Sequence, residues 1–178
     1  YEFPNQTFQK VTLETAISHL TEGALPALKL NNTNGGKCAI ANHEYMIGSF
    51  SSMYMSRNRV RSWDEQSFTI QAGGRHAPIH PQAPKMKSIE KDIRIFISGK
   101  EHLYRRLSVR ECASIQTFPE DFIFYYKKIA AGYKMIGNAV PVNLAEFLAK
   151  SIKEQIKTNE ITTKEEKQTL ITKKSVSI

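Results

Sequence analysis

The spacing of apolar side chains predicts helices toward both ends of the chain and short strands between them. Near the start, apolar residues recur at helical spacing between positions 11 and 20, which predicts a short amphipathic helix. They are Val11, Leu13, Ala16, Ile17 and Leu20. From residue 43 to residue 97, apolar residues form three β-prone runs instead, at 45–50, 67–72 and 93–97. Loops separate these runs, so the middle of the chain is expected to be an irregular, loop-rich β module.

Helical signals return in the last third of the chain. Ser108 and Glu111 have the spacing of a capping box, in which each side chain satisfies the backbone N–H of the other. The helix behind them is expected to end near residues 118–119. A second helix is expected to start at Pro141. Its apolar stripe at Leu144, Leu148, Ile152 and Ile156 predicts a face against a core. From residue 158 onward Thr, Lys and Glu dominate, which predicts a frayed or disordered tail.

Composition limits the class of protein. The chain has 178 residues, 40% of them hydrophobic, which suits one domain or a domain with a small satellite. No apolar run approaches the roughly 18 residues that a membrane helix needs, and no signal peptide is visible.

Cys38 and Cys112 lie far apart without metal-ligand spacing. This indicates the reducing cytoplasm and argues against a structural zinc. Because the chain opens at Tyr1 instead of Met, we expect a fragment or a processed subunit.

Positive charge is concentrated in the middle of the chain. The formal net charge is +8, and residues 57–106 hold eleven Lys or Arg against five Asp or Glu, a net +6. Such an excess favours a polyanionic partner. Arg57, Arg59, Arg61 and Arg75 lie within nineteen residues, and a guanidinium fork matches guanine O6 and N7 as well as phosphate. A solvated basic loop is the alternative that these residues leave open.

Two later segments resemble a known family. Residues 104–119 and 132–141 look like the ninth and tenth conserved motifs of the DNA (cytosine-5)-methyltransferases, in the same order and at a comparable spacing. Residues 55–84 lie where that family has its target-recognition domain, and they resemble the HaeIII-type modification enzymes of restriction–modification systems. The resemblance implies recognition of GGCC in double-stranded DNA and methylation of the inner cytosine at carbon 5, with S-adenosyl-L-methionine as cofactor. The base must be flipped out of the helix for this chemistry.

The resemblance also implies a fold and a division of the chain. The fold is the C-terminal portion of the α/β S-adenosylmethionine-dependent methyltransferase fold, with a small loop-rich β target-recognition domain. Residues 1–30 would be a linker and helix leaving the catalytic domain, and residues 31–103 the target-recognition domain. Residues 104–157 would be the C-terminal elements of the catalytic domain, and residues 158–178 a polar tail.

Several family motifs are missing. The chain has no Pro-Cys pair for the nucleophile, no Phe-x-Gly-x-Gly loop, no Glu-Asn-Val motif and no Gln-x-Arg-x-Arg motif. Cys112 lies on the apolar side of a predicted helix and is expected to be a small hydrophobic residue, and Cys38 is similarly unpromising. We therefore expect no catalytic residue and no metal ligand in this chain. The nucleophile would come from an N-terminal half, either a separate subunit or the missing part of a longer chain.

The candidate DNA contacts are Arg57, Arg59, Arg61, Thr69 and Arg75. We expect base or phosphate contacts from Arg57, Arg59 and Arg75, and a phosphate contact from Arg61; pairing with Asp64 or Glu65 is the alternative. Thr69 with Ile70 matches a Thr-hydrophobic pair near the flipped base, although a purely structural strand is nearly as well supported.

The resemblance assigns roles to the last two motifs as well. Asn138, Ala139 and Val140 are expected to line the cofactor site, with Gly137 allowing close backbone approach; a plain helix-entry turn is the alternative. Arg106, Arg110 and Glu111 are expected to form an ion-paired helix that holds the recognition domain against the catalytic core. Surface or turn roles are expected for His43, His76, His80 and His102.

Three hypotheses for function follow. The first is a methyltransferase half that is active only with its N-terminal partner. The second is a non-catalytic DNA-binding remnant that occupies its site without modifying it. The third is an inert product of gene truncation, whose helices lack the sheet that they cover.

Overall fold

The computed structural model describes residues 1–4 and 10–175, with side chains described through residue 158. Contacts divide the chain into two units, Gln9–Pro141 and a second one made of Tyr1–Phe8 with Val142–Ile178. The first unit contains helices α1 (Leu13–Ile17), α2 (Val109–Ile115) and α3 (Ile129–Asn138). Its strands are β1 (Leu25–Pro26), β2 (Glu44–Tyr45), β3 (Lys87–Glu90) and β4 (Ile93–Ile95). Six 3₁₀ turns complete it: η1 (Ser18–Leu20), η2 (Lys29–Asn31), η3 (Gly35–Lys37), η4 (Tyr54–Ser56), η5 (Gly74–His76) and η6 (Glu101–Leu103).

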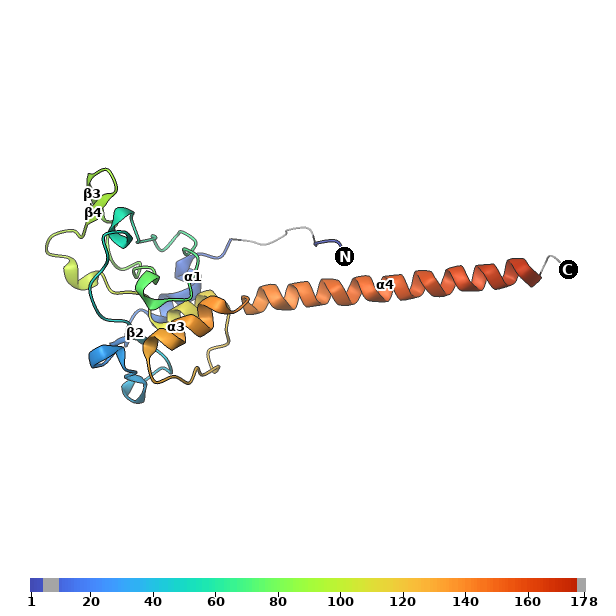
Figure 1. The fold of residues 1–178 in the computed structure, drawn as a ribbon, viewed down its shortest axis with the longest axis horizontal. Helices are drawn as coiled ribbons and strands as arrows, with labels where there is room; N and C mark the ends of the chain where they lie inside the picture. Colours follow the sequence, from blue (N-terminus) through green and yellow to red (C-terminus); the bar gives the residue numbers. More distant parts are fainter. Residues whose placement is uncertain (5–9, 176–178) are drawn as a thin grey trace. The chain divides into compact units, whose positions relative to one another are not determined.

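The strands form two small sheets. β1 and β2 are parallel, with Leu25 opposite Glu44, and β3 and β4 form an antiparallel hairpin with a register shift between Ser88 and Glu90. The hairpin lies at one edge of the first unit (Figure 1). The described residues thus mix helices with short strands, and the predicted loop-rich character of residues 43–97 is confirmed.

Two hydrophobic clusters stabilise the first unit. The larger one joins the three helices through side chains that include Ile17, Leu107, Ile129, Tyr133 and Ile136, all completely buried. The smaller one is formed by Tyr54, Val60, Ile79, Ala83, Met86 and Tyr104. Its members come mostly from residues 54–86, so the loop-rich region has apolar packing of its own. Removing these side chains from water is the main favourable contribution to such packing.

The capping box of α2 is confirmed. Ser108 Oγ accepts from the Glu111 N–H at 3.0 Å, and Glu111 Oε2 accepts from the Ser108 N–H at 2.7 Å. The helix ends at Ile115, and Thr117 has a φ of 60° just before Phe118. The predicted helix over residues 11–20 is also present, as α1 followed by η1.

Two predicted strands are wrong or shortened. Residues 67–72 form no strand, because the backbone turns at Gln71, whose carbonyl accepts from the Gly73 N–H at 2.8 Å. In the run at 45–50 only Tyr45 is in a strand. The carbonyls of Gly48 and Ser49 accept from the Arg106 guanidinium, at 3.1 Å each, instead of from a neighbouring strand.

Helix α3 was not predicted from the sequence. Its ten residues include Gly132 and Gly137, and glycine lowers helix propensity by about 1 kcal/mol per residue relative to alanine. Burial of Ile129, Tyr133 and Ile136 on one face stabilises the helix nonetheless. Packing has overridden propensity here.

The second unit contains the long helix α4 (Val142–Ser175), a single uninterrupted helix in Figure 1. It starts directly after Pro141, as predicted. Its backbone continues through the polar tail, where we expected fraying or disorder, because Lys, Glu and Gln favour helix and the segment contains no Gly or Pro. The predicted burial of its apolar stripe is wrong: Leu144, Ile152 and Ile156 are 42%, 43% and 53% exposed. No helix in the described part of the chain is both long enough and apolar enough to cross a membrane.

Candidate nucleic-acid interface

Arg57 and Arg75 present free guanidinium groups on the surface of the first unit. Both residues are exposed, and neither forms a hydrogen bond or an ion pair with any residue that the structure describes. Arg75 lies in η5, whose first residue is Gly74, and Arg57 follows η4. All donors of both forks are therefore available to an external acceptor.

Arg59 and Arg61 are partly committed to the protein itself. Arg59 donates through Nε to the Tyr54 carbonyl at 2.7 Å and through Nη2 to the Met53 carbonyl at 3.3 Å, and its guanidinium lies 4.8 Å from the Tyr54 ring centre. Arg61 donates to Glu65 Oε1 at 3.0 Å. The alternative of an internal acidic partner thus describes Arg61, while Arg59 retains a free Nη1.

Glu65 is held as an anion by its neighbours. The Ser62 N–H donates to its Oε2 at 2.7 Å, Arg61 donates to its Oε1, and the Lys85 ammonium lies 3.3 Å from Oε2. The Ser62 and Arg61 hydrogen bonds lower the pKa of Glu65 to about 2. The negative charge holds Arg61 within the 61–65 turn and attracts the Lys85 ammonium to it.

Thr69 and Ile70 have opposite environments. Ile70 is 6% exposed and belongs to the larger hydrophobic cluster, whereas Thr69 is exposed. Because no strand forms here, the strand alternative for this pair is wrong. The buried isoleucine instead anchors a loop that holds the threonine hydroxyl at the surface.

A basic cavity of about 650 Å³ lies beside Arg75. Its lining includes Arg75, His76, Arg106 and Lys128, contains no Asp or Glu, and is completed by apolar, amide and hydroxyl side chains. Arg106 is only 4% exposed, and its Nε is buried without a hydrogen-bond partner. A concave surface with several cations and no acid favours an anionic ligand.

Arg106 also shapes the wall of this cavity. Its guanidinium donates to the carbonyls of Gly48 and Ser49 and lies 4.0 Å from the Phe50 ring centre. Burial lowers the pKa of Arg106 from its ordinary value, although an arginine stays protonated at neutral pH. The expected organising role is therefore carried out through backbone carbonyls, and Arg106 has no acidic partner among the described residues.

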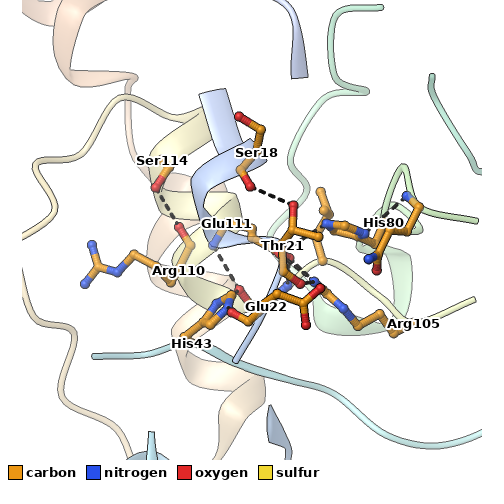
Figure 2. Close-up of polar contacts among 12 residues, drawn as sticks. Ser18, Thr21, Glu22, His43, His80, Arg105, Arg110, Glu111 and Ser114 are labelled. Carbon is orange, nitrogen blue, oxygen red and sulfur yellow. Dashed lines mark hydrogen bonds and ion pairs between the residues drawn. The ribbon is translucent and has the colours of Figure 1, made fainter. Parts of the chain in front are cut away.

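The ion pair of this region is formed by Arg105, which the sequence did not single out. Arg105 makes two hydrogen bonds to the Glu111 carboxylate, at 2.7 and 2.8 Å. Figure 2 shows the two side chains meeting, with Glu111 projecting from α2. Burial disfavours the charged form of Glu111, but Arg105, His80 and the Ser108 N–H outweigh it, so the pKa of Glu111 is lowered. The predicted ion-paired helix exists with a different cation.

Two histidines complete this buried group. The predicted surface role is wrong for both, whereas the turn role is borne out: the Ala83 N–H donates to the His80 carbonyl and the His43 N–H to the Ile40 carbonyl, at 3.1 Å each. His43 and His80 are completely buried. His80 Nδ1 accepts from the Gln82 N–H at 3.2 Å, so its proton is on Nε2, which lies 3.4 Å from Glu111 Oε1. Burial lowers the pKa of His80 to about 4 and also lowers that of His43. Both rings are neutral at pH 7, whereas His76 and His102 are exposed as expected.

Arg110 joins α2 to two other segments by donating to carbonyls. It donates to Ala41 at 2.9 Å, to Pro119 at 3.2 Å and to Phe122 at 2.6 Å. Its side chain extends away from Glu111 (Figure 2). Arg110 thus supports the region structurally, without the ion pair that we expected.

The candidate cofactor residues lie where α3 ends. Asn138 is the last residue of α3, and Ala139 caps it by donating to the Ile136 carbonyl at 3.1 Å. Asn138 is exposed and Val140 is 57% exposed. The segment ends α3 and leads directly into α4, so the cofactor role and the helix-entry turn both stay predictions.

Neither cysteine has the properties of a nucleophile. Cys112 is completely buried in α2, and burial raises its pKa well above the ordinary value. Cys38 is half-buried, and burial together with the nearby Glu44 carboxylate raises its pKa too. A reactive thiol needs a lowered pKa, so both thiols favour structural roles. No group of three or more potential metal ligands occurs among the described residues.

His76 and Lys128 are the cavity residues that sequence reasoning missed. Lys128 precedes α3 and donates to the Leu30 carbonyl at 3.3 Å. The Lys127–Lys128 pair is a visible basic signal, but nothing in the sequence places it beside Arg75. Folding of α3 against η5 brings these cations together.

Comparisons with known proteins agree on one family. Residues 1–154 match the family model described as C-5 cytosine-specific DNA methylase. The chain is 63% identical over 156 residues to the Type II methyltransferase M.MthTI of Methanothermobacter thermautotrophicus, covering 88% of this chain and 47% of that protein. It is 51% identical over 170 residues to M.FnuDI of Fusobacterium nucleatum, covering 94% and 49%. It is 52% identical over 147 residues to M.NgoPII of Neisseria gonorrhoeae, covering 83% of this chain and 42% of that protein. The chain spans about half the length of these curated relatives.

Proposed function

Because the chain belongs to the C-5 cytosine-specific DNA methylase family, we propose that it is the C-terminal portion of a site-specific DNA (cytosine-5)-methyltransferase. It reads a GGCC-like duplex site and presents the flipped inner cytosine for methyl transfer from S-adenosylmethionine. Its relatives are named Type II methyltransferases, which supports a modification role in a restriction–modification system in the bacterial cytoplasm. The observation that carries the proposal is the pair of free arginines, Arg57 and Arg75, with a basic cavity beside the second.

The complete enzyme would have an α/β methyltransferase fold beside a small recognition domain. Residues 31–103, with their own hydrophobic cluster, would form most of that recognition domain. Residues 104–157 would be the last elements of the catalytic domain, preceded by a linker and helix at 1–30 and followed by the tail at 158–178. Arg106, through the Gly48 and Ser49 carbonyls, would hold the two parts together, and Glu111 would do the same through His80.

DNA recognition would depend on the arginines in unequal ways. Arg57 and Arg75 have complete forks available for guanine edges, whereas Arg59 has only Nη1 free beside its bonds to Tyr54 and Met53. Arg61, held by Glu65, would contact phosphate. The Lys128 ammonium in the cavity would attract the backbone of the same duplex, with the His76 ring beside it. Thr69 would face the strand near the flipped base.

The cofactor site would be shared with another part of the enzyme. Asn138 offers an exposed amide and Val140 an exposed apolar side chain at the end of α3. Together with Ala139 they suit one edge of a site for a nucleoside that carries both polar and apolar groups. S-adenosylmethionine would supply the methyl group, and these three residues would help to hold and orient it.

The remaining parts would come from an N-terminal half. Both thiols of this chain have raised pKa values, so the attacking sulfur would be supplied by that half. The exposed stripe of α4 at Leu144, Leu148, Ile152 and Ile156 supports the same idea. Apolar side chains at i, i+4 spacing favour a covering partner.

A reconstitution experiment tests the proposal. The purified chain is assayed alone and with the N-terminal half, and transfer of labelled methyl to a GGCC-containing duplex is measured. Activity only in the mixture is expected. Activity of the chain alone would refute the shared active site. DNA binding without activity in either sample would favour the non-catalytic remnant, and the lack of a cooperative melting transition would favour the inert truncation product.

A further inference from the structure

The loop that carries Thr69 and Arg75 is anchored at both ends. We call residues 69–77 the reading loop. Ile70 and Ala77 are 6% and 3% exposed and belong to the larger hydrophobic cluster. The Ala77 carbonyl also accepts from the Tyr54 hydroxyl at 2.6 Å. The backbone between the anchors is folded on itself, since Gly73 donates to Gln71 and accepts from His76 at 3.0 Å.

Gly137 lets this backbone lie directly against the last turn of α3. A Cβ at Gly137 would be 2.3 Å from both Ala72 N and Gln71 C, and 2.5 Å from Gln71 O. These distances are far below van der Waals contact, and the opposing atoms belong to the backbone. A rotamer change therefore cannot relieve the overlap, and any side chain at position 137 would displace the loop.

Gly74 has a similar role on the other side of the reading loop, because its missing side chain lets the loop pack against Tyr133 of α3. A Cβ at Gly74 would be 2.6 Å from Tyr133 Cδ2 and 2.9 Å from Met46 Cε. The Tyr133 ring is held in turn, because its hydroxyl donates to the Leu107 carbonyl at 2.6 Å. Here the opposing atoms belong to side chains, which have more freedom to move.

We propose that Gly137 is a positioning residue for DNA recognition, because its missing side chain sets the distance between α3 and the reading loop. The proposal rests on the proposed function. Thr69 and Arg75 lie within a few residues of the contact on either side, so a shift at Gln71–Ala72 moves both groups relative to DNA. Gly137 also directly precedes the candidate cofactor residues Asn138–Val140. The end of α3 would therefore support both the reading loop and the candidate cofactor residues.

The contact acts by preorganisation. A guanidinium fork discriminates between bases only when its two donors are already aligned with the base edge. A displacement near 1 Å leaves the charge of Arg75 in place, so general attraction to DNA survives while selectivity falls. Gly137 therefore controls specificity more than affinity.

The test compares Gly137→Ala with Gly36→Ala in the complete enzyme, N-terminal half included. A Cβ at Gly36 would meet no atom within 4 Å, so this variant controls for the glycine-to-alanine change itself. The measured quantity is kcat/KM for a GGCC duplex divided by kcat/KM for a duplex with one base pair changed. Loss of folded protein lowers both values equally and leaves the ratio unchanged.

We expect Gly137→Ala to lower this ratio by about tenfold or more, as a displacement near 1 Å would, and Gly36→Ala to leave it unchanged. An unchanged ratio in a folded Gly137→Ala enzyme would overturn the positioning role. If the unsubstituted enzyme methylates no GGCC duplex, the proposed function has failed, and this is a separate result.

Gly74→Ala decides the matter if Gly137→Ala does not fold. Its Cβ would press on side chains instead of backbone, namely the flexible end of Met46 and the buried Tyr133 ring, so we expect a smaller displacement of the loop and a smaller fall in the same ratio. A ratio equal to that of Gly36→Ala would count against the positioning of the reading loop by α3.

Discussion

An arginine can read a base only if its donors are free, and the four arginines of this chain differ in that respect. Arg57 and Arg75 have no partner among the described residues, whereas Arg59 and Arg61 bond to carbonyls and to Glu65. The sequence separated only Arg61, as a phosphate contact, from the other three arginines. Their side-chain partners depend on how η4 and the 61–65 turn fold, which residue identity alone does not reveal.

Arg75 is expected to determine specificity. Arg75→Ala in the complete enzyme should lower the preference for GGCC by about 1–3 kcal/mol, the discrimination of one bidentate arginine–guanine pair. Competitive methylation of GGCC and altered duplexes measures this preference. Lys91→Ala, an equal charge change at an exposed position, controls for electrostatics. A uniform loss over all sequences, with a shallower salt dependence, would make Arg75 a phosphate contact instead.

Arg59 is expected to contribute mainly to stability. Arg59→Ala removes two hydrogen bonds, to the Tyr54 and Met53 carbonyls, and the contact with the Tyr54 ring. It should lower the free energy of unfolding by about 1–3 kcal/mol. Denaturant melts of Arg59→Ala and Arg57→Ala provide the comparison. Equal stability of the two variants would show that the bonds of Arg59 contribute little.

His80 should make stability depend on pH. The pKa of His80 is about 4 in the folded chain against 6.5 ordinarily, because burial disfavours the charged ring. As the pH falls below 6.5, the unfolded chain takes up a proton that the folded chain does not, so stability falls between pH 6.5 and 4. The loss is at most roughly 3 kcal/mol. Glu111, Arg105 and His43 face the same ring, and Glu111 partly opposes the shift.

His80→Gln and His102→Gln test the origin of this dependence. Melting midpoints are recorded from pH 7.5 to pH 4. The slope should be smaller in His80→Gln and unchanged in His102→Gln, since His102 is exposed. Identical slopes in both variants would assign the pH dependence to other groups.

At the level of elements, the cap of α2 has a second function that spacing did not reveal. Ser108 Oγ accepts from the Glu111 N–H and lies 2.9 Å from His43 Nδ1. His43 Nε2 lies 3.0 Å from the Glu22 carbonyl and must donate there, so Ser108 donates to Nδ1. The hydroxyl thus satisfies two buried groups at once (Figure 2 shows His43 and Glu22).

Ser108→Ala should therefore destabilise the first unit measurably. We expect a loss of about 1–2 kcal/mol, the upper part of the range for N-cap serines, because the His43 ring also loses its donor. Ser114→Ala is the matched control, since its hydroxyl only donates to the Arg110 carbonyl within α2. Losses of the same size in the two variants would argue against the double role.

Local signals predicted some elements well and others poorly. The capping box marked α2, and helical spacing marked residues 11–20, because both signals lie within a few residues. The strand expected at 67–72 does not form, and α3 was not foreseen despite its buried face. Both segments meet in a long-range contact, in which Gly137 lies against Gln71–Ala72. Such a contact cannot be read from either segment alone.

At the scale of the whole molecule, several large apolar side chains are exposed to solvent. The α4 stripe has the pattern of a core-facing helix, yet three of its four residues are more than 40% exposed. Phe122, Ile123 and Tyr125 in the first unit are 48%, 45% and 81% exposed as well. Monomeric proteins seldom leave so many large apolar side chains uncovered. The surface agrees with a chain that spans about half of its relatives.

The sequence predicted the family from motifs and the candidate arginines from a local cluster of positive charge, but it did not predict the basic cavity. Motifs are contiguous, so they survive in half of an enzyme. The cavity combines Arg75, Arg106 and Lys128, which only the fold brings together. The buried Arg105–Glu111 pair was missed for a related reason, because Arg105 and Arg106 are adjacent and only one of them points toward α2.

The most direct test of the account removes both thiols of this chain from the complete enzyme. Cys38→Ser with Cys112→Ala keeps the buried position apolar, and a melting curve verifies folding. Labelled-methyl transfer to a GGCC duplex is then compared with that of the unsubstituted enzyme. We predict that methyl transfer is retained, because we propose that the attacking sulfur is supplied by an N-terminal half. Loss of turnover in a folded double variant would contradict this account.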